Sequence, residues 1–290
     1  MIDTQTKLFA VLGNPLGHSL SPLLQNHFLA QTEQNGIYLA LPIEPGYLET
    51  VLKGLHAIGA GGCNVTIPYK EAVLPLLSAL TPQAEACQAV NTLIPTANGF
   101  IGDNTDGAGL LLALAYEQHW QPQGQTIVLI GAGGAAKGIA VALAQAGAVK
   151  IDIVNRHPER AQALSSWLKS VTGVSSEGLG LETLAEPELY QRTQTFIQTT
   201  SLGMSPHIEE MPPVSVQYLT KEHLVVDIIY NPLESKLLRS ARMQGARTSS
   251  GLGMFIHQGA LSFERWLGIR PQTAPLYPIL QTELQKRRGR

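Results

Sequence analysis

The sequence predicts an α/β fold with two domains, the first of them built on a mostly parallel sheet. The first hundred residues alternate apolar strand-like segments with helix-like segments, a rhythm typical of βαβ units. A strand-like run at 126–130 then leads through a glycine-rich turn into a helix-like run, as in a Rossmann-like domain. The length of 290 residues suits two domains or one large one. We therefore expect an N-terminal mostly parallel α/β domain, a Rossmann-like domain, and a cleft between them.

Glycine and proline mark the ends of the elements predicted in the N-terminal domain. A strand at 8–12 stops at Gly13-Asn14-Pro15, and a helix follows with Ser21 as N-cap and Pro22 in its first turn. A strand at 38–42, a helix at 47–58 and a strand at 62–67 come next, and Pro68 closes the last of these. The segments 92–95 and 99–102 predict a short hairpin.

The rest of the chain continues the alternation. A helix is expected at 106–117 and a linker at 121–125. The strand at 126–130, the glycine-rich turn and a helix at 137–146 come next, and another strand follows at 150–154. Segments 195–198 and 224–229 are predicted as later strands, 170–179 as a loop or weak helix end, 254–266 as a helix, and the basic residues 286–288 and 290 as a solvated tail. We expect domains at 1–105 and 106–250, with a C-terminal helical segment at 251–290 that closes onto the first.

The turn Gly131-Ala132-Gly133-Gly134-Ala135-Ala136 predicts a dinucleotide site. Its spacing fits the G-x-G-x-x-A pattern, in which glycines let the backbone approach a pyrophosphate and a helix N-terminus attracts its charge. A tight structural turn is the alternative interpretation. The flanking strand and helix, and the second strand at 150–154, favour the dinucleotide site.

The end of that second strand favours NADP as the cofactor. An NAD site carries an acidic residue roughly 20 residues past the glycines, where it holds the ribose 2′-hydroxyl. Here the strand ends in Asn155-Arg156-His157, with Arg160 one turn on, and Asp152 lies three residues too early. A guanidinium matches the oxygens of a 2′-phosphate. The alternative is that Arg156 is an ordinary surface charge.

Composition excludes several functional classes. Hydrophobic residues make up 44% of the chain, ample for a packed core, and a net charge of -2 gives no footprint for nucleic acid. The two cysteines show no CxxC spacing, which fits a reducing compartment. The first residues lack the apolar core of a signal peptide, and the apolar runs are too short to span a bilayer. These features predict a cytoplasmic protein without a membrane segment.

Polar side chains gather at the strand ends of the first domain. Ser19 and Ser21 precede a helix N-terminus, where two hydroxyls and the helix dipole can hold a carboxylate; a simple N-cap is the alternative for Ser21. Asn64 and Thr66 share one face of a strand. Lys70 follows, although a lone lysine is usually a solvated surface residue.

Two further groups complete this set, and together they suit a small polyhydroxylated acid. Asn91 precedes a strand, and Asp106 begins a helix that it could merely cap. Hydride transfer between a nicotinamide and a carbonyl needs a proton donor or acceptor at the oxygen, which Lys70 and Asp106 would supply as a pair. No HExxH or Cys/His spacing suggests a metal, and four histidines are assigned structural or surface positions: His18, His27, His119 and His257.

In their order along the chain, these motifs resemble the shikimate dehydrogenase family. The resemblance spans about residues 8–268 and rests also on the glycine-rich loop and Asn155-Arg156. The other motifs that carry it are GNPLGHSLSP at 13–22, NVTIPYK at 64–70, AVNT at 89–92, GDNTDG at 102–107, and GLGM at 251–254 followed by Gln258.

The resemblance implies NADPH-dependent reduction of 3-dehydroshikimate to shikimate, in aromatic amino-acid biosynthesis. It implies that Lys70 and Asp106 are the catalytic pair. The substrate contacts it implies are Ser19, Ser21, Asn64, Thr66, Lys70, Asn91, Asp106, Tyr230 and Gln258. The cofactor residues it implies are Gly131, Ala132, Gly133, Gly134, Ala135, Asn155, Arg156, His157, Arg160, Thr200, Ile228, Gly251 and Met254.

Two positions depart from the family pattern. Gln25 stands where a histidine is common in the first helix, and His157 stands where threonine is common, which leaves the contacts to the 2′-phosphate open. An NAD-dependent quinate/shikimate dehydrogenase is one alternative function, and the missing acid at the strand tip argues against it. A non-catalytic metabolite-binding paralogue is the other, and the intact Lys70 and Asp106 argue against it. The expected partner is a small-molecule substrate, with no nucleic acid and no membrane; a homodimer stays open.

Overall fold

The computed structural model describes residues 2–288, which form two compact units. Unit 1 contains the chain up to Asp106 together with Ile256–Leu280, and unit 2 contains Gly107–Phe255 and the chain from Gln281 onward. The boundary expected between residues 105 and 106 lies one residue before this division, which falls between Asp106 and Gly107. The segment at 251–290 is shared between the two units.

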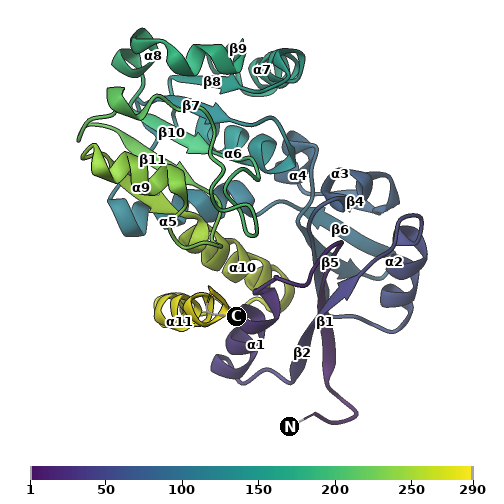
Figure 1. Cartoon of the computed structure of the whole chain (residues 1–290). Coiled ribbons are helices and arrows are strands. Elements are labelled where there is room, and N and C mark those ends of the chain that lie inside the picture. Colours follow the sequence, from purple (N-terminus) through teal and green to yellow (C-terminus); the bar gives the residue numbers. More distant parts are fainter. Residues whose placement is uncertain (1, 289–290) are drawn as a thin grey trace. The chain divides into compact units, whose positions relative to one another are not determined.

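Unit 1 is built on a six-stranded mixed sheet in the order β2-β1-β3-β5-β6-β4 (Figure 1). β1 pairs in parallel with β2 and β3, β5 runs antiparallel to β3 and β6, and β4 is parallel to β6. The hairpin predicted at 92–95 and 99–102 is therefore β5–β6. The strands are β1 (Lys7–Gly13), β2 (Gly36–Pro42), β3 (Gly62–Val65), β4 (Ala79–Leu80), β5 (Thr92–Thr96) and β6 (Gly99–Asp103).

The helices of unit 1 bury apolar side chains against this sheet. In α2, Leu48, Leu52 and Leu55 recur at helical spacing and join the core formed by the strands. The expectation that Ser21 caps α1 is wrong: Leu20 occupies the N-cap position without a side-chain cap bond, and Ser21 is the first helical residue. Helices that start in this unit are α1 (Ser21–Gln31), α2 (Leu48–Ala57), α3 (Tyr69–Ala72), α4 (Pro82–Cys87), α5 (Asp106–Gln118) and α11 (Leu276–Arg288).

Unit 2 is built on a six-stranded parallel sheet in the order β12-β11-β10-β7-β8-β9. Its central strands are buried on both faces, and their continuous apolar runs reflect this. β11 ends two residues earlier than expected, so Ile228 follows the strand. The strands are β7 (Thr126–Ile130), β8 (Lys150–Val154), β9 (Gly178–Leu179), β10 (Thr195–Gln198), β11 (Leu224–Asp227) and β12 (Arg247–Ser250).

Helices cover this sheet and approach one another closely. A Cβ on Gly107, near the start of α5, would overlap the carbonyl oxygen of Gly138 in α6, so these two helices pack backbone to backbone. The segment 170–179, expected as a loop or weak helix end, begins with the last residues of α7, which runs to Thr172; the strand β9 at Gly178–Leu179 was not expected. The helices that start here are α6 (Gly134–Gln145), α7 (Pro158–Thr172), α8 (Pro187–Arg192), α9 (Lys236–Met243) and α10 (Gly251–Leu267).

The C-terminal residues differ from the expected solvated tail. Residues 286–288 belong to α11, whose Leu276, Leu280 and Leu284 are buried at intervals of four. Arg290 lies outside the described residues. No helix in the described part of the chain is both long and apolar enough to cross a membrane.

Candidate active site

The centre of the site in unit 1 is an ion pair between Lys70 and Asp106. Lys70 lies in α3, just after β3, and Asp106 is the first residue of α5, just after β6. The Nζ of Lys70 lies 2.5 Å from Oδ2 of Asp106, and their side chains are 17% and 5% exposed. The pair is therefore shielded but still reached by solvent on the lysine side. An ammonium and a carboxylate in this arrangement can hold a proton at a substrate oxygen.

Asn91 orients the carboxylate of Asp106 from its other side. The backbone N–H of Thr105 can only donate, and it donates to Oδ1 of Asn91 at 2.9 Å, which fixes the orientation of this amide. The Nδ2 of Asn91 then donates to Oδ1 of Asp106 at 2.8 Å. Each oxygen of the Asp106 carboxylate consequently has its own donor, one from Lys70 and one from Asn91.

Asn64 is held in the same way behind this pair. Its Nδ2 donates to the backbone carbonyl of Asn91 at 3.0 Å and to Oγ of Ser262 at 2.9 Å. Because a carbonyl only accepts, Oδ1 must point the other way, where the phenol of Tyr38 donates to it at 2.7 Å. Burial raises the pKa of the Tyr38 phenol well above its usual range, so this donor keeps its proton.

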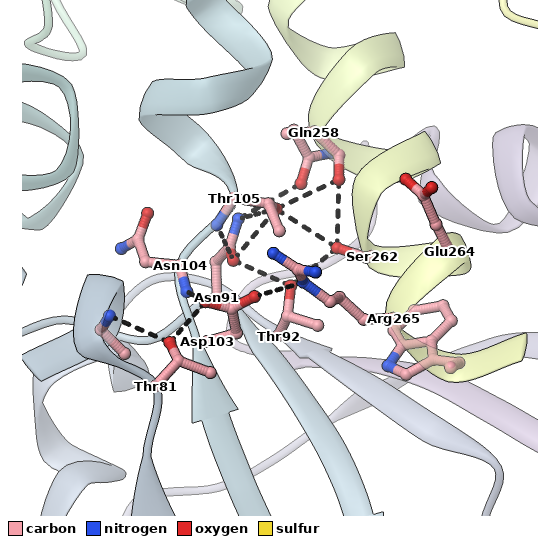
Figure 2. Close-up of polar contacts among 12 residues, drawn as sticks. Thr81, Asn91, Thr92, Asp103, Asn104, Thr105, Gln258, Ser262, Glu264 and Arg265 are labelled. Carbon is pink, nitrogen blue, oxygen red and sulfur yellow. Dashed lines mark hydrogen bonds and ion pairs between the residues drawn. The ribbon is translucent and has the colours of Figure 1, made fainter. Parts of the chain in front are cut away.

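Side-chain oxygens accept the backbone N–H groups of three successive residues at the start of α5, and Figure 2 shows the groups around Asp103, Asn104 and Thr105. The backbone N–H of Asn104 donates to Oδ1 of Asp103 at 2.8 Å, and that of Asp106 donates to Oδ1 of Asn104 at 3.1 Å. The N–H of Thr105 between them is taken by Asn91. Three successive backbone donors thus hold the turn that carries Asp106, and all of these groups are buried.

The other expected substrate residues fall into four places. Ser19 and Ser21 are half-buried at the start of α1, where Oγ of Ser19 accepts from the backbone N–H of Ser21 at 3.2 Å. Thr66 is half-buried after β3, and Gln258 in α10 accepts from Asn91 at 3.3 Å. Tyr230 belongs to unit 2, where its ring stacks on Phe255 with centroids 4.6 Å apart.

In unit 2 the glycine-rich turn has the geometry of a phosphate cradle. Gly131 follows β7 at φ +119°, a conformation that side chains rarely adopt, and a Cβ there would overlap Oγ1 of Thr199. Gly133 occupies the N-cap position of α6, which has no side-chain cap bond. Residues 132–135 are accessible to solvent. The first N–H groups of a twelve-residue helix therefore meet an open glycine turn, which suits a pyrophosphate.

The strand tip with the expected 2′-phosphate contacts lies directly beside this turn. The backbone N–H of Gly131 donates to the carbonyl of Val154, the last residue of β8, at 2.8 Å. Asn155 follows, and its side chain donates to the carbonyl of His157 at 3.2 Å at the start of α7. Arg156, His157 and Arg160 are exposed, with His157 Nδ1 3.5 Å from the carboxylate of Glu159.

The remaining cofactor candidates line the same edge of the sheet. Thr200 follows β10, Ile228 follows β11 and Gly251 follows β12, so each lies just beyond the carboxyl end of a parallel strand. Met254 comes one turn later in α10. Ligands of open α/β sheets bind at this edge. The donor set of the glycine turn and the arginine-bearing tip fits an NADP phosphate group.

Several site residues were not expected from the sequence. Tyr38, Asp103 and Ser262 are all nearly inaccessible to solvent and hydrogen-bonded to the groups described above. Ser262 could have been found, because it lies one helical turn after Gln258. Tyr38 gave no signal, since a tyrosine in a buried strand is usually core.

Among the described residues, no group of three or more His, Cys, Asp and Glu side chains could hold a metal ion. The two cysteines, Cys63 and Cys87, are buried and not disulfide-bonded. Burial raises the pKa of each thiol to about 12, so neither is a reactive thiolate.

A parallel sheet with a glycine turn at its carboxyl edge, joined in one chain to a shielded lysine–carboxylate pair, defines a dinucleotide-dependent enzyme of the two-domain α/β class. Three family models match the chain: the shikimate dehydrogenase substrate binding domain at 11–93, shikimate / quinate 5-dehydrogenase at 113–228, and the shikimate 5'-dehydrogenase C-terminal domain at 251–280. The chain belongs to the shikimate dehydrogenase family.

Individual relatives agree with this assignment. The NADP(+) shikimate dehydrogenase of Geobacillus sp. (strain WCH70) is 42% identical over 96% of this chain and 99% of its own length. A crystal structure of a shikimate dehydrogenase in complex with NADP+ is 34% identical, with a TM-score of 0.89, over 99% of this chain and 97% of its own. The Thermus thermophilus enzyme, crystallised with NADP(H) and shikimate, is 31% identical, with a TM-score of 0.83, over 97% and 99% of the two chains.

Proposed function

We propose that this chain catalyses the reversible NADPH-dependent reduction of 3-dehydroshikimate to shikimate, a step of the shikimate pathway to aromatic amino acids. The observation that carries the proposal is the shielded pair formed by Lys70 and Asp106. A lone surface lysine would not be 17% exposed and 2.5 Å from a buried carboxylate. Family membership and the open glycine turn at the α6 N-terminus support the cofactor.

In this proposal Lys70 and Asp106 handle the proton, while bound NADPH would supply the hydride for reduction and bound NADP+ would accept it in the reverse direction. During reduction, the carbonyl carbon gains the hydride and the ammonium of Lys70 gives a proton to the oxygen, which becomes the hydroxyl. In the reverse direction the lysine takes that proton back. Asp106 holds the ammonium in place through Oδ2, while Asn91 prevents the carboxylate from turning away. Both groups are preorganised, which reduces the reorganisation required at the moment of transfer.

The remaining roles follow the chemistry of each group. We assign Ser19 and Ser21 to the substrate carboxylate, because both hydroxyls stand at the N-terminal end of α1. The ring hydroxyls and the reacting oxygen are assigned to Lys70 and Asp106 with five further residues: Asn64, Thr66, Asn91, Tyr230 and Gln258. We assign the pyrophosphate to the turn at 131–135, the 2′-phosphate to Asn155, Arg156, His157 and Arg160, and the rest of the cofactor to Thr200, Ile228, Gly251 and Met254.

This assignment gives each part of the chain a different role. Residues 1–105 would bind substrate and carry out proton transfer, and residues 106–250 would bind NADP. Residues 251–290 would close onto the first domain, which the grouping of Ile256–Leu280 with unit 1 supports. The two buried thiols support a reducing, cytoplasmic location. Sedimentation of the purified chain tests whether it forms a homodimer.

A single assay tests the function. The purified protein is offered shikimate or quinate with NADP or NAD, and absorbance at the NADPH band is followed. We expect the highest kcat/KM with shikimate and NADP. Higher kcat/KM with quinate and NAD would replace the proposal by the alternative dehydrogenase, and the absence of turnover with every pair would support a metabolite-binding protein.

A further inference from the structure

One face of α10 contacts the polar residues around Asp106 through three side chains. Gln258, Ser262 and Arg265 are spaced four and three residues apart, so they form a single stripe along the helix. Figure 2 shows all three side chains pointing from the helix toward the polar residues around Asn91, Thr92 and Asp103. Only Gln258 is assigned to the substrate above. The other two residues hold the groups behind the site.

Arg265 reaches the carboxylate of Asp103. Its Nε lies 2.8 Å from Oδ2, and the arginine side chain is 55% exposed while that of Asp103 is 2% exposed. Oδ1 of Asp103 accepts from the hydroxyl of Thr81 at 2.6 Å and from the backbone N–H of Asn104 at 2.8 Å. A buried carboxylate needs such partners, because an unpaired charge in this position would be strongly destabilising.

Asp103 is in turn the first residue of the turn that ends at Asp106. Its backbone carbonyl accepts from the N–H of Asn91 at 3.0 Å, and its carboxylate fixes the N–H of Asn104. The side chain of Asn104 then accepts from the N–H of Asp106. Arg265 therefore supports Asp106 indirectly, through Asp103 and Asn104, and does not itself contact the reacting groups.

Ser262 acts on the two asparagines. It is fully buried, its Oγ accepts from Nδ2 of Asn64 at 2.9 Å, and the same Oγ lies 3.1 Å from the carbonyl oxygen of Gln258. The hydroxyl of Thr92 lies 2.7 Å away and donates to Oδ1 of Asn91 at 2.9 Å. Removing the Ser262 hydroxyl would leave Nδ2 of Asn64 short of one acceptor inside a buried network.

We propose that Arg265 and Ser262 are positioning residues for proton transfer: they hold Asp106 and the two asparagines in their reactive orientation from α10. This proposal rests on the function proposed above. It predicts that loss of either contact slows the chemical step more than it weakens cofactor binding, because small misplacements of a reacting group are costly in rate.

The first test uses Arg265→Met, which keeps the length of the side chain and removes the charge, with Arg270→Met as the matched control. Arg270 also ion-pairs with a carboxylate, that of Glu264, at 2.6 Å, and both of these side chains are solvent-accessible. We expect Arg265→Met to lower kcat with shikimate roughly tenfold, with KM for NADP within about twofold of wild type. Arg265→Lys should recover part of the loss. Arg270→Met should behave as wild type.

Ser262→Ala extends the test to the asparagine side, and Ser262→Thr restores the hydroxyl. We expect Ser262→Ala to lower kcat/KM for shikimate by roughly three- to tenfold, and Ser262→Thr to regain activity if the extra methyl group is accommodated. A kcat within twofold of wild type in both Arg265→Met and Ser262→Ala would overturn the proposal. So would equal losses in Arg265→Met and Arg270→Met.

Amide hydrogen exchange gives a readout that does not depend on turnover. If Arg265 holds the turn, Arg265→Met should speed exchange at the N–H groups of Asn104, Thr105 and Asp106, while Arg270→Met leaves them protected. Unchanged protection in Arg265→Met would overturn the positioning role even in an active enzyme. If wild type showed no turnover, the proposed function would fail and these exchange rates alone would decide the role of Arg265.

Discussion

The ammonium of Lys70 lies 2.5 Å from the Asp106 carboxylate, although 36 positions separate the two residues. The strand order brings them together. Lys70 follows the end of β3 and Asp106 follows the end of β6, and only β5 lies between these two strands in the sheet. Because β5 runs antiparallel to both neighbours, β3 and β6 point the same way and their ends meet at one edge.

Lys70→Ala is expected to remove most turnover while the fold stays intact. A positioned acid or base contributes roughly 10²–10⁴-fold to rate, and kcat should fall by that order while substrate affinity changes less. Steady-state kinetics with shikimate and NADP measure both quantities. Lys53→Ala is the control, since Lys53 also pairs with a carboxylate but is 76% exposed. A near-normal kcat in Lys70→Ala would show that another group moves the proton.

Asp106→Asn is expected to lower kcat about 10²-fold or more. The amide would set a donor against either the ammonium of Lys70 or Nδ2 of Asn91, so one of the two contacts must break. The helix start should survive, because the backbone N–H of Asp106 keeps its bond to Asn104. Circular dichroism checks the fold, and Asp3→Asn at an exposed carboxylate is the comparison. Wild-type rates would leave Asp106 only a structural role.

Ser19→Ala and Ser21→Ala are each expected to raise KM for shikimate. A lost hydrogen bond to a charged group costs about 1.5–3 kcal/mol, which corresponds to roughly a tenfold or larger change in affinity. Ser21→Ala removes no side-chain cap of α1, whose N-cap residue Leu20 has none, whereas Ser19→Ala removes the bond that Oγ of Ser19 accepts from the backbone N–H of Ser21. Ser78→Ala, which loses a hydroxyl bonded to the Phe100 carbonyl, serves as control. If KM stayed at the wild-type value in both variants, the substrate carboxylate would bind elsewhere.

Arg156→Ala is expected to raise KM for NADP roughly ten- to a hundredfold and to leave the use of NAD nearly unchanged, because only NADP carries the 2′-phosphate. The side chain is exposed beside the glycine turn, so its removal should not disturb packing. Arg239→Ala, at another exposed arginine of unit 2, is the control. Equal losses with both cofactors would assign Arg156 a structural role. A higher wild-type kcat/KM with NAD would overturn its assignment to the 2′-phosphate.

Asp227 is expected to make stability depend on pH between about 4 and 6. Burial raises the pKa of this carboxyl from 3.8 to about 6, although Ser235 and the N–H of Ile229 donate to it. The folded state then holds its proton over a range where the unfolded state has lost it. The contribution of Asp227 to the free energy of unfolding therefore falls as pH rises from about 4 to 6, by about 3 kcal/mol in total, and stays constant above.

Urea denaturation at several pH values measures this effect. In Asp227→Asn the titration is gone, so the stability of the variant relative to wild type should rise between pH 4 and pH 6.5. Glu186→Gln, at an exposed carboxylate of the same unit, should show no such trend. A constant difference between Asp227→Asn and wild type across this range would contradict the raised pKa.

The sequence predicted the parts of the fold that depend on local pattern. The apolar run of β7, the glycine turn and α6 lie next to one another in the chain, so periodicity and composition locate them. β9, β12 and α11 were missed because each is short or polar and is stabilised by its neighbours. β12, for example, contains Arg247-Thr248-Ser249-Ser250 and pairs with β11 at the edge of the sheet.

The site residues likewise divide into those that the local sequence indicates and those whose roles depend on contacts between distant parts of the chain. Lys70 and Asp106 could be proposed as partners from their chemistry, but the orientation of their neighbours could not. The roles of Tyr38 and Ser262 depend on which atom of Asn64 faces a backbone carbonyl, and that is decided by contacts 26 and 198 positions apart in the chain. Ser21 was misplaced as a cap because Leu20, which has no capping side chain, takes that position.

The glycine turn also constrains how the gene can vary. Every amino acid reached from a glycine codon by one nucleotide change carries a Cβ, and at Gly131 that atom meets Thr199 in a conformation that side chains avoid. At Gly133 a Cβ would meet no heavy atom within 4 Å. In a library of variants, changes at codon 131 should therefore reduce the amount of folded protein. Changes at codon 133 should leave the amount of folded protein unchanged. Variants with such changes should disappear from the library only when growth depends on cofactor binding.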